Sequence, residues 1–402
     1  MSSLAHQTHS VAATGTTEHG HTLAVPLLAI AAFSIVTTEY IIVGLLPGVS
    51  RDLRISISAA GQLVTLFAFT VMLFGPVLTV LLSHVERKRL FVIILAIFAV
   101  SNAVAAWSPN IWVLGLARLL PALALPVFWG TASETAGELV GPERAGKAVS
   151  QVYLGISAAL VFGIPLGTLA AQGFGWRGTF WGLSALSIVM AILLQVFMPT
   201  LPRPQRLRIG EQLRILKDPF FLANIALSVV VFTAMFTSYT YLADTLELLA
   251  HIPPAQVGWW LMGFGGVGMI GNWLGGHFVG RNPLTATLVA AAVLALGMAA
   301  STLFAGSTVW LALTLVVWGI ANTALFPICQ VRVMKSASHA QALAGTLNVS
   351  MANAGIGLGA IIGGVAIHHV GLWSVGYIGA AVAVFALVTV PFIARFDLNE
   401  LQ

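Results

Sequence analysis

The feature that most constrains this chain is a series of twelve apolar stretches, each long enough to cross a lipid bilayer as a helix. Such a helix needs about 20 mostly apolar residues to cross the roughly 30 Å hydrocarbon core. The predicted spans are residues 23–46, 58–82, 90–107, 111–130, 148–174, 178–198, 220–242, 257–279, 283–304, 309–330, 343–368 and 373–394. The sequence therefore predicts a polytopic, all-α membrane protein.

The composition excludes most soluble classes of protein. Of the 402 residues 8% are charged and 58% are hydrophobic, whereas an average soluble domain has about 25% charged residues. So few charges cannot cover the surface of a soluble fold of this length. A cytosolic enzyme, a disordered tail protein and a nucleic-acid binder are excluded. The single cysteine, Cys329, excludes a disulfide within the chain, and we expect neither a metal nor a cofactor.

The distribution of Lys and Arg predicts which ends of the spans face the cytoplasm. Fourteen lie in one set of alternating loops, three (Arg51, Arg54 and Arg177) lie in the other set, and Arg118 lies within a span. Cytoplasmic loops carry the excess of basic residues, so both termini are predicted to be cytoplasmic. The predicted parts are a disordered tail (1–22), a six-helix bundle (23–198), a cytoplasmic linker (199–219), a second six-helix bundle (220–395) and a cytoplasmic tail (396–402).

A fixed offset of 196 residues relates the two bundles. Gly75, Gly163, Gly167 and Gly175 recur as Gly271, Gly359, Gly363 and Gly371. A six-span unit repeated in the same orientation is typical of transporters that hold their substrate between two halves, near the middle of the membrane. The repeat therefore predicts a transporter that works by alternating access.

Four segments carry more specific patterns. They are TTEYIIVGLLPGV (37–49), LARLLPALALPVFWG (116–130), GISAALVFGIPLGTLAAQGFGWRGTF (155–180) and TSYTYL (237–242). Together they resemble the sugar efflux transporters, in the drug:proton antiporter branch of the major facilitator superfamily. The similarity covers essentially the whole chain after residue 22. It implies the major facilitator fold, with 12 transmembrane helices in two six-helix halves, and export of small sugars across the bacterial inner membrane, driven by inward proton movement.

Glu39 and Arg118 are the acid and the base predicted to lie well inside the spans. Charged side chains in hydrocarbon are costly, so they usually face a cavity and pair with each other. At about 1.5 Å per residue, both lie roughly 10–12 Å below the outer surface, and in the resembled fold their spans line the central cavity. We predict that Glu39 binds a proton and thereby releases Arg118 to interact with the solute. The alternative is a static ion pair that locks the helices.

Gly155, Gly163, Pro165 and Gly167 resemble the antiporter signature of span 5, in a shortened GxPxG form. Glycines allow helices to approach closely, and a proline kinks the helix and frees a carbonyl. We therefore predict that these residues take part in conformational exchange, with simple packing glycines as the alternative.

The loop between spans 2 and 3 resembles the superfamily's gating motif at its basic end, Arg87 and Lys88. Ser83 occupies the position of the motif's aspartate, so the charge relay between the two halves lacks its acid unless Glu86 substitutes for it. The alternative is a plain basic anchor at the cytoplasmic surface.

Span 7 carries aromatic residues at helical spacing. An aromatic face against the apolar side of a pyranose, with hydroxyl and amide partners, suits a weakly held sugar. The predicted substrate-binding residues are Phe232, Phe236, Tyr239, Tyr241, Trp129, Asn322, Asn348 and Asn353, with Asn272 and Trp318 as further candidates. Asp244 and Glu247, past the end of this span, are predicted to be solvated in an external loop.

These features predict a proton-coupled antiporter that exports small sugars or sugar-like solutes by alternating access. A multidrug or nucleoside antiporter of the same fold is the alternative. An intramembrane enzyme is disfavoured because the chain lacks GxSxG, HExxH and a clustered intramembrane His/Asp set, so no catalytic residue is assigned. The expected partners are a small solute, protons and the lipid bilayer, without nucleic acid, and the chain is expected to act as a monomer.

Overall fold

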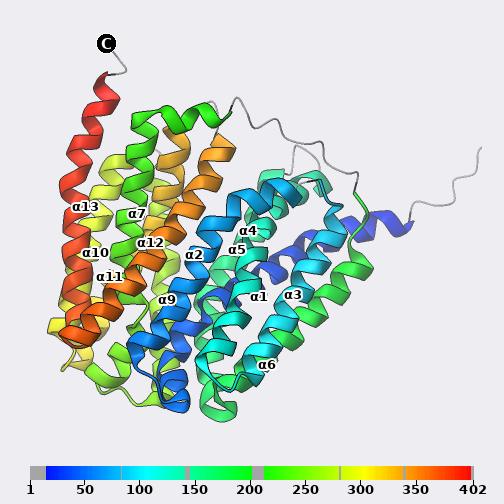
Figure 1. The fold of residues 1–402 in the computed structure, drawn as a ribbon. Helices are drawn as coiled ribbons and strands as arrows, with labels where there is room; N and C mark the ends of the chain where they lie inside the picture. The colour runs from blue at the N-terminus through cyan, green and yellow to red at the C-terminus, as the bar shows by residue number, and fades with distance from the viewer. Residues whose placement is uncertain are drawn as a thin grey trace, which may run out of the picture.

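The computed structural model describes residues 15–82, 84–140, 145–201, 212–279, 282–337 and 341–399. Within these ranges the chain consists of helices and short turns, without a strand (Figure 1). The helices are α1 (Gly15–Leu53), α2 (Ile57–Leu82), α3 (Arg87–Trp107), α4 (Ile111–Val140), α5 (Ala145–Ala158), η1 (Ala159–Gly163), α6 (Ile164–Phe197), η2 (Gln212–Lys217), α7 (Pro219–Tyr239), α8 (Leu242–Asp244), η3 (Thr245–Leu249), α9 (Pro254–Phe278), α10 (Pro283–Leu303), α11 (Thr308–Lys335), α12 (Gln341–His369) and α13 (Ser374–Asn399).

The prediction of twelve transmembrane helices is confirmed. Ten segments of the described chain are long and apolar enough to cross a membrane. One of them, Leu154–Phe197, contains two crossings because the helix breaks at Gly175 and the Thr179 hydroxyl donates back to the Gly167 carbonyl, 2.9 Å away. The twelfth crossing is α9, whose eight glycines lower its hydropathy.

The predicted tails and linker lie partly outside the described residues, which leave out 1–14, 202–211 and 400–402. Helix α1 begins at Gly15, inside the predicted tail 1–22. Part of the predicted linker 199–219 forms the 3-10 helix η2, and α13 continues to Asn399. We call the end of the bundle where the linker lies the linker end. The opposite end, with the turns at 54–56, 108–110 and 304–307, is called the far end (Figure 1).

The 196-residue repeat is visible in the packing of its glycines. A Cβ at Gly163 would lie 2.1 Å from Oγ1 of Thr37, and a Cβ at Gly359 would lie 2.7 Å from the carbonyl oxygen of Thr233, which is the residue equivalent to Thr37. In the far-end turns, Gly175 and Gly371 both have a positive φ, 70° and 116°, a region that favours glycine. The halves α1–α6 and α7–α13 therefore repeat one another in structure as well as in sequence.

Two seams join the halves. In the first, α2 packs against α12 (Figure 1), and in the second, η1 and α6 pack against α9. In the first seam, the Thr65 hydroxyl donates to the Gly357 carbonyl over 3.3 Å. In the second seam the backbones approach closely, because a Cβ at Gly265 would lie 2.4 Å from the carbonyl oxygen of Leu160. Glycine at position 265 therefore allows the halves to touch at mid-height.

Replacing Gly265 by Ala should weaken this second seam. The added methyl group has no room beside the Leu160 carbonyl, and overpacking of this kind costs about 1–3 kcal/mol. We expect a lower midpoint of thermal unfolding in detergent. Gly266→Ala is the matched control, since a Cβ there meets nothing within 4 Å; equal midpoints for the two variants would contradict the contact.

Candidate functional site

Arg118 is the centre of a buried polar cluster that joins three helices. Its side chain is 1% exposed, and its guanidinium donates to the backbone carbonyls of Thr38 (2.5 Å) and Glu39 (2.7 Å) in α1. The guanidinium carbon also lies 4.5 Å from the centre of the Phe67 ring in α2, a cation–π arrangement. Arg118 therefore fastens α4 to α1 and α2.

The structure brings Glu39 and Arg118 together, but through the backbone of Glu39. Among the ion pairs of the described residues, none joins the two side chains. The Glu39 carboxyl group experiences the Arg118 charge at longer range. Since Arg118 donates to carbonyls, its hydrogen bonds do not depend on the ionisation of Glu39. The contact that locks α4 to α1 is therefore separate from the carboxyl group that can take up a proton.

A polar strip that the sequence analysis missed continues from this cluster. Asn102 donates to Oγ1 of Thr38 (3.1 Å), Thr38 donates to the Ser34 carbonyl (2.9 Å), and the hydroxyl oxygens of Ser34 and Ser187 lie 3.2 Å apart. All four residues are buried. These short polar side chains link α1 to α3 and α6 within the first half.

A small cavity lies between the halves, next to Glu39. Its lining residues are Tyr40, Leu160, Ile164, Phe236, Tyr239, Leu261, Phe264, Gly265, Asn322, Thr323 and Phe326, and its volume is about 20 Å³. One water molecule needs about 10–15 Å³ on this measure, so the structure shows the cavity nearly closed.

Five of the eleven residues that line the cavity are aromatic. The ring centres of Tyr40 and Phe236 are 6.0 Å apart, those of Phe236 and Tyr239 are 5.4 Å apart, and Tyr239 stacks on Phe264 at 5.7 Å. Tyr40 and Phe236 occupy equivalent positions of the repeat, 196 residues apart. The cavity therefore lies on the pseudo-twofold axis that relates the halves.

Three of the eight predicted substrate-binding residues line this cavity, namely Phe236, Tyr239 and Asn322. Phe232 lies one layer behind, with its ring edge-to-face against Phe326 at 5.1 Å. Phe326 was not among the predicted residues, although it follows Asn322 by four residues and therefore shares its helix face.

The other predicted residues lie away from the cavity. Tyr241 lies in the α2–α12 seam and donates to the Ala360 carbonyl (2.7 Å). Asn348 donates to Gln330 (2.7 Å), Asn353 donates to the Val349 carbonyl (3.0 Å), and Trp129 packs against Phe128. Of the two further candidates, Asn272 is exposed and Trp318 packs against Phe264 behind the wall.

The span 5 glycines pack against α1. A Cβ would lie 2.2 Å from the Ala29 carbonyl at Gly155, 2.1 Å from Thr37 at Gly163 and 2.4 Å from Ile41 at Gly167. The chain just before Pro165 forms the π-helix η1, an irregularity often found at functional sites. The Pro165 carbonyl faces α9, 3.0 Å from the place a Cβ of Gly258 would occupy. The motif thus touches α1 on one side and the second half on the other.

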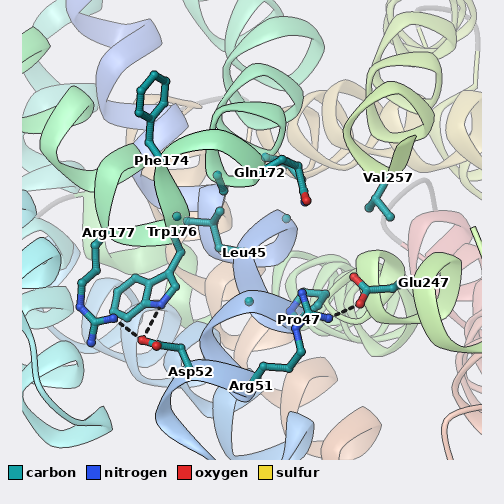
Figure 2. Close-up of a pocket in the computed structure, with 15 residues that line it drawn as sticks. Leu45, Pro47, Arg51, Asp52, Gln172, Phe174, Trp176, Arg177, Glu247 and Val257 are labelled. Carbon is teal, nitrogen blue, oxygen red and sulfur yellow. Dashed lines mark hydrogen bonds and ion pairs between the residues drawn. The ribbon is translucent and has the colours of Figure 1, made fainter. Parts of the chain in front are cut away.

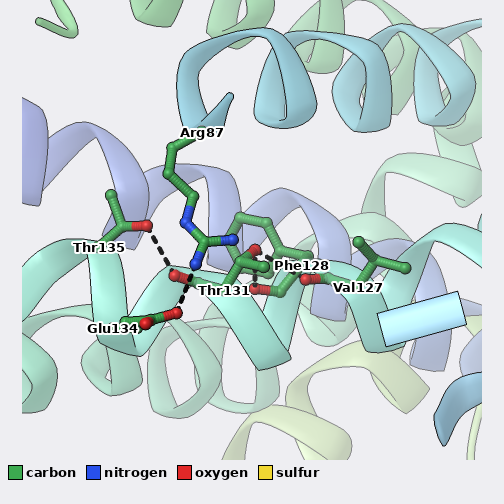
Figure 3. A network of polar contacts seen from close by, with 6 residues as sticks. All are labelled: Arg87, Val127, Phe128, Thr131, Glu134 and Thr135. Carbon is green, nitrogen blue, oxygen red and sulfur yellow. Dashed lines mark hydrogen bonds and ion pairs between the residues drawn. The ribbon is translucent and has the colours of Figure 1, made fainter. Parts of the chain in front are cut away.

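In the gating loop, Arg87 is buried at the linker end of α4 (Figure 3). Its guanidinium lies 2.5 Å from the carboxylate of Glu134. Glu86 instead caps α3 by accepting hydrogen bonds from the backbone amides of Lys88 and Arg89, both at 3.0 Å. The suggestion that Glu86 supplies the missing acid is therefore wrong, because its carboxylate is committed to the helix terminus. Ser83 lies outside the described residues.

Two further charged residues are buried where the sequence analysis expected solvent. Arg332, assigned to a loop, is 2% exposed and donates to Thr287, Ser228 and the Asn224 carbonyl at 2.8, 2.8 and 3.1 Å. Asp244, assigned to an external loop, is fully buried. Both assignments are wrong because the helices continue past the predicted span ends: α11 extends to Lys335, while α8 and η3 extend to Leu249.

The far end contains a polar vestibule of about 580 Å³ between α1, α6, η3 and α9 (Figure 2). Within the first half, Asp52 pairs with Arg177 and accepts a hydrogen bond from the Trp176 indole (3.1 Å). Between the halves, Arg51 of α1 pairs with Glu247 of η3. This second pair shows that Glu247 is not a free loop residue.

A double-mutant cycle can test the coupling between Arg87 and Glu134. Because Glu134 is half exposed, water screens the pair, and we expect a coupling free energy of about 1 kcal/mol or less but above zero. The free energy of unfolding is measured in mixed detergent for the wild type, Arg87→Ala, Glu134→Ala and the double variant. Lys88→Ala, combined with Glu134→Ala, is the control and should show no coupling. Additive effects of Arg87→Ala and Glu134→Ala would contradict the pair.

Comparisons with known proteins agree with this architecture. Residues 28–351 match the sequence profile described as "Major Facilitator Superfamily". The chain is 35% identical to the inner membrane transport protein YdhP of Escherichia coli K12, over 92% of this chain and 96% of that protein. It is 29% identical to a probable sugar efflux transporter of Helicobacter acinonychis, over 91% and 94%.

Solved structures share the fold at low sequence identity. The nucleoside transporter NupG superposes with a TM-score of 0.75 at 16% identity, over 93% of this chain and 99% of that one. A D-xylose–proton symporter superposes with a TM-score of 0.74 at 14% identity, over 94% and 98%. The chain therefore belongs to the major facilitator superfamily and is a twelve-helix membrane transporter, not an enzyme.

Proposed function

We propose that this protein is a proton-coupled antiporter that exports small sugars or sugar-like solutes across the bacterial inner membrane. The observation that carries the proposal is the aromatic cavity on the axis between the halves, next to an intramembrane carboxyl group. Aromatic rings from both halves and the Asn322 amide match the apolar face and the hydroxyl groups of a sugar ring. The names of relatives such as the Helicobacter protein support a sugar as solute.

In this proposal Glu39 is the coupling group and Arg118 its fixed neighbour. Tyr40, the next residue, lines the cavity, so binding of a solute and protonation of Glu39 affect adjacent groups. A carboxylate in a low-dielectric interior is costly, and the Arg118 charge offsets that cost. Protonation removes the negative charge while Arg118 keeps its two carbonyl acceptors. The cluster then carries net positive charge, which favours a polar solute or an opening of the cavity to water.

The orientation of the protein is part of the proposal. The linker end is assigned to the cytoplasm because fourteen of the eighteen Lys and Arg residues belong to the loops, tails and helix ends on its side of the sequence. The far end, with its vestibule, then faces outward. Both halves of one chain supply lining residues to the cavity, and we propose on this ground that the protein works as a monomer.

A nucleoside or drug exporter is the second candidate. Ring stacking in the cavity suits a flat base or an aromatic drug as well as a pyranose. The structural likeness to NupG concerns the fold alone at 16% identity.

Replacing Glu39 by Gln should abolish efflux driven by a proton gradient while solute exchange continues. The neutral amide imitates the protonated carboxyl group but cannot release a proton. The measurement compares net efflux with counterflow in proteoliposomes, and Asp52→Asn, on the same helix, serves as the control. Proton-driven efflux that survives in Glu39→Gln would remove Glu39 from the coupling mechanism.

Replacing Asn322 by Ala should raise the KM for the solute by about twofold to twelvefold, since one hydrogen bond contributes about 0.5–1.5 kcal/mol. Asn272→Ala is the matched control, because Asn272 is exposed and lies outside the cavity lining. Uptake would be measured in inverted vesicles with an imposed proton gradient and a panel of pentoses, hexoses, thiogalactosides, nucleosides and cationic drugs. Uptake of drugs or nucleosides alone would overturn the assignment to sugars.

A further inference from the structure

The far end is closed by an ion pair between equivalent positions of the two halves. Arg51 at the end of α1 and Glu247 in η3 are 196 residues apart, which is the offset of the repeat (Figure 2). Equivalent positions of a twofold arrangement meet only near its axis. The Glu247 side chain is 9% exposed, whereas that of Arg51 is 56% exposed. A separation of the halves at the far end must break this pair and expose the Glu247 carboxylate to water.

Asp244 lies one helical turn before Glu247 and is fully buried. Neither of its carboxyl oxygens accepts a hydrogen bond from another described residue. The short helix α8, which ends at Asp244, packs against α1 and η3. The charged groups that face Asp244 from these elements are Arg51 and Glu247. The neighbouring phenol, Tyr241, has its hydroxyl donating to Ala360 instead.

An ionised Asp244 would be unstable in this arrangement. Burial of a carboxylate without hydrogen bonds or a paired cation is strongly unfavourable, and such a group becomes neutral instead. The nearest cation, Arg51, forms its ion pair with Glu247. Ionisation of Asp244 would also place a second negative charge close to Glu247. The closed far end therefore accommodates Asp244 in its neutral, protonated form.

We propose that Asp244 is a second proton-binding site, separate from Glu39, and that the proton it binds holds the far end closed. With Asp244 neutral, Arg51 pairs with Glu247 across the halves. When the halves part, water reaches the buried carboxyl group and stabilises its ionised form, so the open state releases the proton. Because the closed state binds the proton more tightly, acid shifts the population toward closure and alkali shifts it toward opening. This site requires no particular solute and extends the proposed function.

The test measures the distance across the vestibule by double electron–electron resonance. Spin labels are placed on cysteines at Gln172 in α6 and Gln256 in α9, both exposed, on opposite halves of the far end. The native Cys329 is buried and the chain has no other cysteine. Labelled protein in nanodiscs without solute is measured from about pH 5 to about pH 9, which brackets the titration of buried carboxyl groups in proteins.

We expect the ratio of short to long distances to fall at least tenfold in the wild type as the pH rises. Asp244→Asn should show the short distance at every pH, because its amide cannot ionise. Asp52→Asn, at the same mouth, should keep the wild-type dependence on pH. Glu247→Gln should favour the long distance, since Arg51 loses its partner across the halves.

A wild type without a pH-dependent change overturns the proposal, and so does an Asp244→Asn variant that retains the change. If Asp244→Asn does not fold, Asp244→Ala takes its place, because it cannot ionise either, and a pH-dependent change that persists in it overturns the proposal. Loss of the change in Asp52→Asn would assign the titration to Asp52 and overturn the proposal as well. No transport is measured here, so failure of this test is distinct from failure of sugar export.

Discussion

The hydrocarbon core of a lipid bilayer contains no water to solvate a charged side chain. The protein must therefore supply hydrogen-bond partners for that side chain from neighbouring helices. The Arg118 guanidinium donates hydrogen bonds to two carbonyls of α1 and lies over an aromatic ring of α2. The Arg332 guanidinium donates hydrogen bonds to oxygens of α7 and α10. Arg87 likewise reaches α4 from the start of α3. Each buried arginine connects helices of its own half. These contacts make the halves internally rigid, which is a condition for moving them as units against each other.

The contacts between the halves are of a different kind. Along both seams, glycines let the halves pack closely: Gly265 and Gly258 meet η1 and α6, and Gly357 meets the Phe69 ring. Such contacts are van der Waals contacts between closely packed helices, and they can separate without leaving a charge unpaired. The ion pair of Arg51 with Glu247 is the exception, and it lies at the far end, beside the vestibule, where water can replace it. Rigid halves with a separable boundary are what alternating access requires.

The two halves repeat one scaffold but carry different chemistry on it. The axis positions Tyr40 and Phe236 place an aromatic ring from each half in the cavity wall. The intramembrane acids break the symmetry: Glu39 of the first half lies beside the cavity, and Asp244 of the second half lies under the far-end ion pair. Position 48, equivalent to Asp244, is a glycine, and position 235, equivalent to Glu39, is a methionine. In the proposed mechanism, two carboxyl groups at different depths let proton binding affect the cavity and the far end separately.

The sequence by itself determined the number of membrane crossings, the repeat and the proximity of Glu39 to Arg118. These follow from the length of apolar segments, from a fixed offset and from the scarcity of intramembrane charge, which are all properties of the linear chain. The tertiary structure decided that Arg118 binds the backbone of Glu39, that Glu134 is the acid beside Arg87, and that Phe326 joins the cavity wall. It also decided that Asp244 is buried, because α8 and η3 continue the helical segment beyond residue 242, where the sequence predicted the span to end. Hydropathy measures whether a segment can enter the membrane, whereas the partner of each polar side chain depends on which helix packs beside it.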